Sequence, residues 1–221
     1  VLGYPANSFD EVFEALQDRI KNQGGQVHLE SPVREILRNE IGATGLRVDP
    51  EKGDPFEQDF DTILATNASF DFVKLIDLPD DYRSKLEDVH YMAAVVLIVE
   101  MKHPLTSTYW MNIADESIPF LGLIEHTNLM TKEMYGGNNV LYLTNYLDRD
   151  EPMFSMSKEE LLAHYLPHLK KFNPDFDESW ITKVHYNALS AAQPIITPNY
   201  AERMPSHRTP VKNLYLGNTT Q

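Results

Sequence analysis

The sequence of 221 residues lacks cysteine altogether. Disulfide bridges, thiolate catalysis and cysteine-ligated zinc sites are therefore excluded, and nothing indicates secretion. Basic residues are few, because 19 Lys and Arg stand against 33 Asp and Glu, and the formal net charge is −14. Nucleic acids and anionic membrane surfaces are disfavoured as partners, since both carry negative charge themselves.

Long apolar runs are also missing. The longest, Met92 to Val99, is far too short to span a bilayer, and no signal peptide is visible. We therefore expect a cytoplasmic protein without a transmembrane segment. The remaining composition, with 42% hydrophobic and 24% charged residues, is ordinary for a globular chain of one or two domains.

Several motifs that carry chemistry do not occur. There is no Gly-x-Gly-x-x-Gly fingerprint for a pyrophosphate, and no Gly-x-Ser-x-Gly elbow that would indicate a hydrolase. His164 and His168 have the spacing of a helical metal site, but Pro167 disturbs the helix between them. We therefore expect no metal site.

The first part of the chain has the pattern of a helix followed by strands. Apolar residues recur at helical spacing from Phe9 to Ile20, after a capping box at Ser8 and before Gly24-Gly25. A polar loop is expected over residues 50–59. The segments predicted as strands are 26–30, 33–38, 44–48 and 61–66, and those predicted as helices are 69–76 and 80–88.

The middle of the chain has the pattern of a mainly antiparallel sheet. A capping box from Ser157 to Glu160 opens a helix that is expected to reach Phe172, and residues 192–210 are rich in proline and extended. The predicted strands are 91–101, 108–113, 120–126, 140–146 and 180–189.

The chain closes with a short apolar strand, Val211 to Leu216, which Gly217 and Asn218 end. A strand that stops at glycine allows backbone N–H groups to approach a ligand closely, because no Cβ intervenes. The sequence Asn213-Leu-Tyr-Leu-Gly-Asn218 resembles the last flavin-binding strand of the FAD-dependent amine oxidase, protoporphyrinogen oxidase and phytoene desaturase superfamily.

Two further segments resemble the same superfamily in the same order. Gly24-Gly25 followed by Val27 to Val33 and Ile36 is similar to its helix, Gly-Gly and strand segment. Phe60 to Thr66 is similar to the strand that returns to the flavin domain. The stretch from Tyr109 to Asn128 resembles the bacterial protoporphyrinogen-oxidase-like branch.

The resemblance implies an α+β (mixed α/β) fold. A mainly antiparallel substrate-domain sheet with flanking helices would occupy residues 67–207, and incomplete parts of an FAD-binding α/β domain would occupy residues 1–66 and 208–221. Because the dinucleotide fingerprint is missing, we expect the chain to begin downstream of it. A chain without that loop is not expected to retain FAD or to be active by itself, and it could associate with itself through exposed surface.

The resemblance also implies a site. Backbone near Val33 would contact the adenine end of FAD, and Ala65 and Thr66 would lie at a strand end where the flavin passes. Gly217 would abut the flavin. Asn218 departs from the usual acidic residue of the family, which puts its cofactor contacts in doubt.

The substrate-lining candidates are Trp110, His126 and Tyr146, which lie on predicted strands or at their ends. An aromatic sheet face suits an apolar or planar small molecule, although it equally suits a packed core. His126 could transfer protons near neutral pH or be a hydrogen-bonded structural histidine.

The function implied by the resemblance is oxidation of a C–H or C–N bond by hydride transfer to FAD. The rival hypothesis is a non-enzymatic module whose antiparallel sheet and helices bind an apolar ligand.

Overall fold

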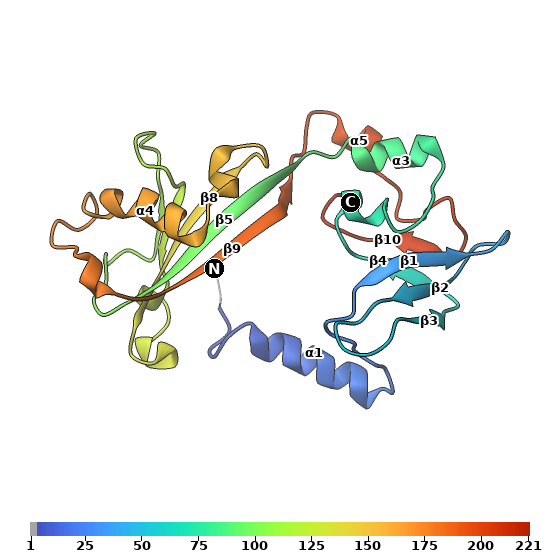
Figure 1. The fold of residues 1–221 in the computed structure, drawn as a ribbon, viewed down its shortest axis with the longest axis horizontal. Coiled ribbons are helices and arrows are strands. Elements are labelled where there is room, and N and C mark those ends of the chain that lie inside the picture. Colours follow the sequence, from blue (N-terminus) through green and yellow to red (C-terminus); the bar gives the residue numbers. More distant parts are fainter. Residues whose placement is uncertain (1–3) are drawn as a thin grey trace. The chain divides into compact units, whose positions relative to one another are not determined.

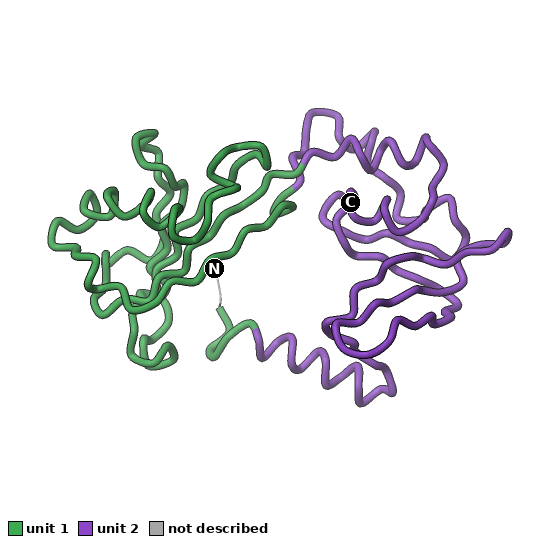
Figure 2. The backbone as a smooth tube through the Cα atoms, in the orientation of Figure 1, with its two compact units in different colours: residues 1–9, 91–193 green, residues 10–90, 194–221 purple. Residues whose placement is uncertain are grey.

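The computed structural model describes residues 4–221. It divides into two compact units, which Figure 2 shows in different colours. The five-stranded unit comprises residues 1–9 and 91–193, and the parallel-pair unit comprises residues 10–90 and 194–221. The sequence-based division places its boundaries after residue 66 and before residue 208 instead. The assignment of one part to the cofactor and the other to the substrate stays a prediction.

The parallel-pair unit contains a three-stranded antiparallel sheet in the order β1-β2-β3 (Figure 1). Its strands are β1 (Val33–Arg38), β2 (Ala43–Val48) and β3 (Phe56–Asp59). The turn between β1 and β2 depends on Asn39, whose Oδ1 accepts hydrogen bonds from the N–H of Ile41 at 2.8 Å and of Gly42 at 3.1 Å. The predicted bounds of β1 are confirmed.

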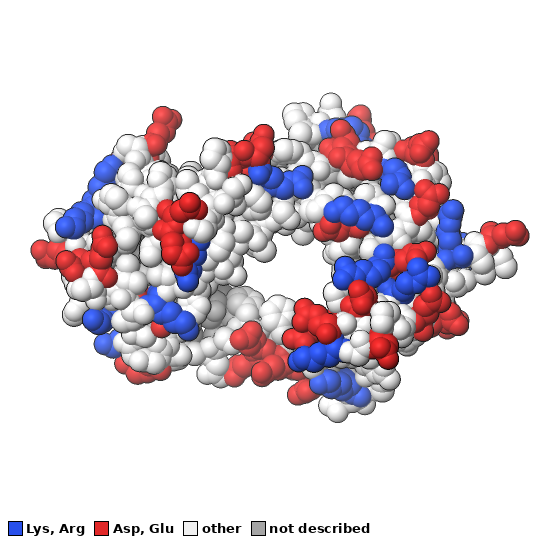
Figure 3. Space-filling view, viewed as in Figure 1, with Lys and Arg blue, Asp and Glu red and all other residues white. Residues whose placement is uncertain are grey.

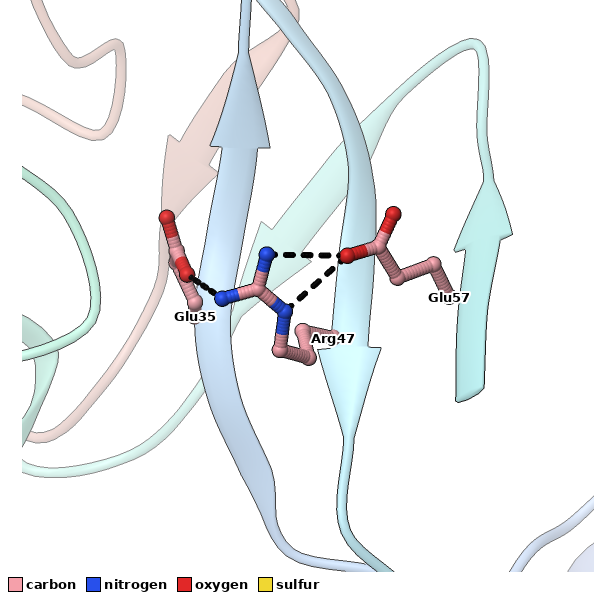
Figure 4. A network of polar contacts seen from close by, with 3 residues as sticks. All are labelled: Glu35, Arg47 and Glu57. Atoms are coloured by element: carbon pink, nitrogen blue, oxygen red, sulfur yellow. Dashed lines mark hydrogen bonds and ion pairs between the residues drawn. The ribbon is translucent and has the colours of Figure 1, made fainter. Parts of the chain in front are cut away.

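Strand β3 lies in the segment that the sequence predicts as a polar loop, so that part of the prediction is wrong. All four residues of β3 are exposed, and no apolar alternation marks it as a strand. Arg47 of β2 bonds Glu35 of β1 on one side and Glu57 of β3 on the other (Figure 4). Its Nε and Nη2 lie 3.0 Å and 2.9 Å from Glu57 Oε1. Cross-strand ion pairs therefore join the three strands on an exposed side of the sheet, and β3 is otherwise held by its antiparallel backbone pairing with β2.

A separate pair of parallel strands completes this unit. Strand β4 (Ile63–Ala65) pairs with β10 (Leu214–Leu216), so the two predicted flavin-type strands lie side by side although about 150 residues separate them. The helices of the unit are α1 (Asp10–Asn22), α2 (Ser69–Phe72), α3 (Asp80–Glu87) and α5 (Tyr200–Arg203). Its core gathers buried side chains from β1, β4, β10, α2 and α3, among them Ile36, Ile63, Phe72, Leu86 and Leu216.

The five-stranded unit is built on one sheet in the order β6-β7-β8-β5-β9. Its strands are β5 (Tyr91–Met101), β6 (Trp110–Asn112), β7 (Gly122–Glu125), β8 (Asn139–Leu147) and β9 (Ile181–Pro194). The pairings of β6 with β7, β7 with β8 and β8 with β5 are all antiparallel, as predicted. Short 3₁₀ turns are η1 (His126–Asn128), η2 (Lys132–Tyr135), η3 (Pro152–Ser155) and η4 (Glu178–Trp180).

Helix α4 (Lys158–Leu169) packs against this sheet. Its predicted capping box is confirmed, because Ser157 Oγ accepts from the N–H of Glu160 while Glu160 Oε2 accepts from the N–H of Ser157. Leu161, Tyr165 and Leu169 follow at four-residue spacing and are fully buried. The helix ends at Leu169, three residues before the predicted end.

The mixed α and β fold with antiparallel sheets is confirmed, and the deviations from the prediction are local. Residues 26–30 form no strand. The helix predicted over residues 69–76 is shorter, because α2 ends at Phe72. The short helix α5 interrupts residues 192–210, which were predicted to be extended. Acidic and basic side chains are interspersed over the face in Figure 3. None of the helices within residues 4–221 is long and apolar enough to cross a membrane.

Candidate functional site

The parallel-pair unit contains a cleft of about 650 Å³. It brings Val33 at the start of β1 together with Ala65 and Thr66 at the end of β4, three of the five predicted cofactor contacts. Its lining is mostly apolar, with the charged side chains of Arg34, Asp71 and Lys74 among it. The other lining residues are Pro32, Ile36, Leu46, Ile63, Leu64, Asn67 and Leu75.

Gly217 follows β10 directly beside the cleft-lining end of β4. Its N–H donates to the carbonyl oxygen of Ala65 at 2.9 Å, which continues the parallel ladder by one bond. A Cβ placed on Gly217 would meet only Leu64 Cδ1, at an ordinary contact distance of 3.5 Å. The chain itself therefore leaves room at this position, at the carboxyl end of two parallel strands, where α/β folds bind ligands.

Asn218 is the fifth predicted contact, and its side chain is fully engaged within the chain. Its Nδ2 donates to the carbonyl oxygen of Asn67 at 2.8 Å and to Ser69 Oγ at 3.3 Å. Its Oδ1 accepts from the N–H and the Oγ1 of Thr220 at 2.9 Å and 2.7 Å. Asn218 thus ties the segment after β4 to the segment after β10, a task that needs an amide because a carboxylate donates nothing.

The cleft has the features that a flat, mostly apolar cofactor edge requires. Apolar side chains line it, two strand ends approach it, and the glycine beside it leaves free space. The residues present therefore fit part of a flavin cofactor. Whether Val33, Ala65, Thr66, Gly217 and Asn218 contact one stays a prediction.

The second candidate region is the face of the five-stranded sheet opposite its core. Along β5 the odd-numbered residues from Ala93 to Met101 are buried in the core, and the even-numbered ones point the other way. The register sets Trp110, Ile124, Tyr142 and Ile98 side by side across β6, β7, β8 and β5. We call this surface the aromatic face. Trp110 and Tyr146, two of the predicted substrate contacts, are 55% and 45% exposed.

His126, the third predicted substrate contact, lies at the end of β7 within a cluster of tyrosines. Its Nε2 is 2.6 Å from the hydroxyl of Tyr135, and the ring centroids of Tyr4, Tyr135 and Tyr142 lie 5.4, 5.3 and 5.6 Å from its own. Burial lowers the pKa of His126, so the imidazole is neutral at neutral pH. Only 5% of the residue is exposed, and its direct contact with a substrate stays a prediction.

Glu125 was not singled out from the sequence, and the structure shows it fully buried. Its Oε2 accepts from the N–H groups of Leu105 and Thr106 at 3.0 Å and 3.2 Å, while Oε1 has no hydrogen-bond partner within residues 4–221. Burial raises the pKa of the Glu125 carboxyl to about 7. A glutamate at the end of an otherwise apolar strand was the available signal. Through its hydrogen bonds with Leu105 and Thr106, Glu125 holds the loop between β5 and β6.

Glutamine in place of Glu125 is expected to flatten the dependence of stability on pH. The unfolded chain loses this proton above its ordinary pKa of 4.5, whereas the folded chain keeps it up to about pH 7. Stability of the wild type therefore falls as pH rises through that window, by at most about 3 kcal/mol. Urea denaturation at several pH values measures the loss in both chains.

The matched control is Glu116→Gln, because Glu116 is exposed and should behave as the wild type does. A Glu125→Gln chain that loses as much stability over this window as the wild type would show that Glu125 is ionised when folded.

Glu100, a charged residue on the aromatic face, was also not singled out from the sequence. Glu100 of β5 accepts hydrogen bonds from His185 Nε2 at 2.8 Å and from Asn138 Nδ2 at 3.0 Å. The hydrogen bond from His185 is the main reason that the pKa of Glu100 is lowered. No sequence signal could have found the pair, since 85 residues separate its members. Glu100 pairs with Val140 across the ladder, which sets it diagonal to Tyr142 on the same face.

No group of three or more His, Asp or Glu side chains among residues 4–221 has the arrangement of a metal site.

Comparisons with known proteins define the class to which this fold and these strand ends belong. The sequence model of the family described as "Flavin containing amine oxidoreductase" matches residues 4–221. The chain therefore belongs to the flavin-containing amine oxidoreductase family. No curated protein sequence matches it.

Solved structures share the fold at low sequence identity. A protein from Exiguobacterium sp. 255-15 assigned as a protoporphyrinogen oxidase has a TM-score of 0.75 at 17% identity, covering 96% of this chain and 46% of that one. An oxidoreductase from Methanosarcina mazei has a TM-score of 0.71 at 16% identity, covering 98% of this chain and 50% of that one. A reduced UDP-galactopyranose mutase has a TM-score of 0.70 at 11% identity, covering 91% and 43%. The chain thus spans half or less of each of these relatives.

Proposed function

We propose that the chain forms part of a longer flavin-dependent oxidoreductase that oxidises a C–H or C–N bond of a small apolar or planar molecule. The observation that carries the proposal is the match to the amine oxidoreductase family over residues 4–221. The cleft, in which β1 and β4 bring Val33, Ala65 and Thr66 together next to Gly217, supports it.

FAD is the cofactor that the family implies, and when bound it supplies hydride acceptance. In this proposal backbone at Val33, Ala65, Thr66 and Gly217 holds part of the cofactor against the ends of β4 and β10. Asn218 supports the cofactor site indirectly in this proposal, because its side-chain amide joins the two segments that follow these strands.

The aromatic face is the proposed surface for the substrate. Trp110 and Tyr146 offer exposed rings for a flat apolar body, and Ile98 and Ile124 lie in the same row as Trp110. The ionised Glu100 with His185 adds one charged position to this face, which would orient a polar group of the substrate.

The longer protein is expected to purify with a flavin absorption spectrum, and FAD is expected in the supernatant after heat denaturation. The measurements are absorbance after gel filtration and chromatography of the released cofactor. A colourless protein that instead binds lipids or isoprenoids would favour the rival hypothesis of a non-enzymatic apolar-ligand module.

A further inference from the structure

Residues 103–108, between β5 and β6 in the five-stranded unit, form a segment that is tied to the sheet at both ends. Before it, the N–H of Lys102 donates to the carbonyl oxygen of Trp180 at 2.8 Å. After it, the carbonyl oxygen of Tyr109 accepts from the N–H of Glu125 at 2.9 Å. We call residues 103–108 the flap. Side chains from three other places in the unit hold the flap between these two ends.

Two of the three anchors are neutral amides, and the third is a carboxyl group. Asn128 Nδ2 donates to the carbonyl oxygen of Thr106 at 3.0 Å, and Asn173 Nδ2 donates to that of Leu105 at 3.1 Å. Glu125 Oε2 accepts from the N–H groups of Leu105 and Thr106. Glu125 is therefore the only one of the three anchors that can ionise.

The closed flap accommodates the carboxyl of Glu125 poorly when it carries a charge. Glu125 is fully buried, and its Oε1 has no hydrogen-bond partner among residues 4–221. A buried charge with one oxygen unpaired is costly, whereas a protonated carboxyl carries no charge and can still accept both N–H groups at Oε2. Moving the flap away from Glu125 removes the burial that penalises the charge. Ionisation and opening of the flap therefore favour each other.

No charged neighbour relieves this penalty. Burial raises the pKa of Glu125, and only the two backbone hydrogen bonds from the flap act against it. The other ionisable side chains on the flap, beside it and on the segments around its anchors are Lys102, His103, Tyr109, His126, Tyr142, Lys171 and Asp175. None of them contributes to the pKa shift of Glu125.

We propose that the flap stays closed while Glu125 is protonated and opens more often once Glu125 is ionised. The flap leads directly into Tyr109 and Trp110, so its opening loosens the start of β6 at the edge of the aromatic face. A consequence for substrate binding rests on the proposed function of that face. The opening itself does not, and it can be measured without substrate or flavin.

Amide hydrogen exchange of the purified chain, followed residue by residue, tests the proposal. The open flap gives up the Glu125 proton above its ordinary pKa of 4.5 and the closed flap only at about 7, so rising pH favours opening up to about pH 7. Protection of the Leu105 and Thr106 N–H groups, corrected for the intrinsic effect of pH, is expected to fall by up to about 70-fold from about pH 5 to about pH 8.

Urea below the unfolding transition distinguishes opening of the flap from unfolding of the whole chain. Opening of the flap exposes little surface, so the exchange of Leu105 and Thr106 should respond weakly to urea. The N–H groups in the ladder between β5 and β8 exchange through larger openings and should respond steeply. Equal protection and equal urea dependence of the two groups would overturn the proposal, as would protection of the flap that does not change with pH.

Two variants assign the effect to Glu125. Glu125→Gln carries no charge at any pH, and its flap amides are expected to keep the same protection across the pH range. Asn128→Ala is the matched control, because it removes a neutral anchor at an exposed position. It should lower the protection of the flap at every pH and keep the wild-type dependence on pH. A Glu125→Gln chain whose flap still loses protection as pH rises would contradict the proposal. If that variant does not fold, the pH and urea dependence of the wild type decides.

Discussion

Valine in place of Gly217 is expected to abolish flavin retention by the longer enzyme while leaving the parallel-pair unit folded. A Cβ at this position meets only Leu64 Cδ1, at 3.5 Å, so the chain itself tolerates a side chain there. The N–H of Gly217 can still donate to the carbonyl oxygen of Ala65. The two γ-methyl groups would instead fill the space at the strand ends that the cofactor needs. Flavin absorbance per polypeptide after gel filtration is the measurement.

Two further variants make this result specific. Gly217→Ala adds only the Cβ and is expected to lose flavin partly, between the wild type and the valine variant. Ala188→Val adds a similar β-branched side chain at an exposed position on β9 and is expected to keep its flavin. Normal flavin content in Gly217→Val would remove Gly217 from the cofactor site.

The chain by itself is expected to bind FAD several orders of magnitude more weakly than a complete flavoenzyme of this family. A glycine-rich loop and a helix N-terminus usually hold the pyrophosphate, and no Gly-x-Gly-x-x-Gly occurs among the 221 residues. Each charge-assisted hydrogen bond that is missing costs about 1.5–3 kcal/mol. Every 1.4 kcal/mol or so is tenfold in affinity, so a few such bonds account for the expected loss.

Calorimetric titration of the purified chain with FAD measures this affinity. Binding at micromolar concentration or tighter with a defined stoichiometry would contradict the expectation. In that case the same titration of Gly217→Val would show whether the cleft beside β4 and β10 is responsible, because the substitution should then weaken the binding.

Residue patterns alone predicted the elements whose burial is one-sided or complete. Strand β5 has a long apolar sequence and β1 alternates next to a turn, and both have their predicted bounds. Strand β3 could not be predicted in this way, since its four residues are exposed and it is held by backbone pairing with β2, across which Glu57 forms an ion pair with Arg47. Residues 26–30 alternate like a strand but find no partner strand, because pairing requires a neighbour that no local pattern specifies.

The residues of the candidate site could likewise be predicted only in part from the sequence. The resemblance pointed to Val33, Ala65 and Thr66 because the sequences at these strand ends are similar to family motifs. The cleft brings the three residues together. The resemblance could not show that the side chain of Asn218 is occupied by Asn67, Ser69 and Thr220.

The sequence by itself determined the family, the mixed fold class and most of the helices and strands, because these follow from local periodicity, capping residues and short motifs. Only the tertiary structure decided which distant groups meet. It paired β4 with β10, buried Glu125 against the loop before β6, and joined Glu100 to His185. The physical reason is that burial, hydrogen-bond partners and shifted pKa values depend on neighbours in space, which chain order alone does not specify.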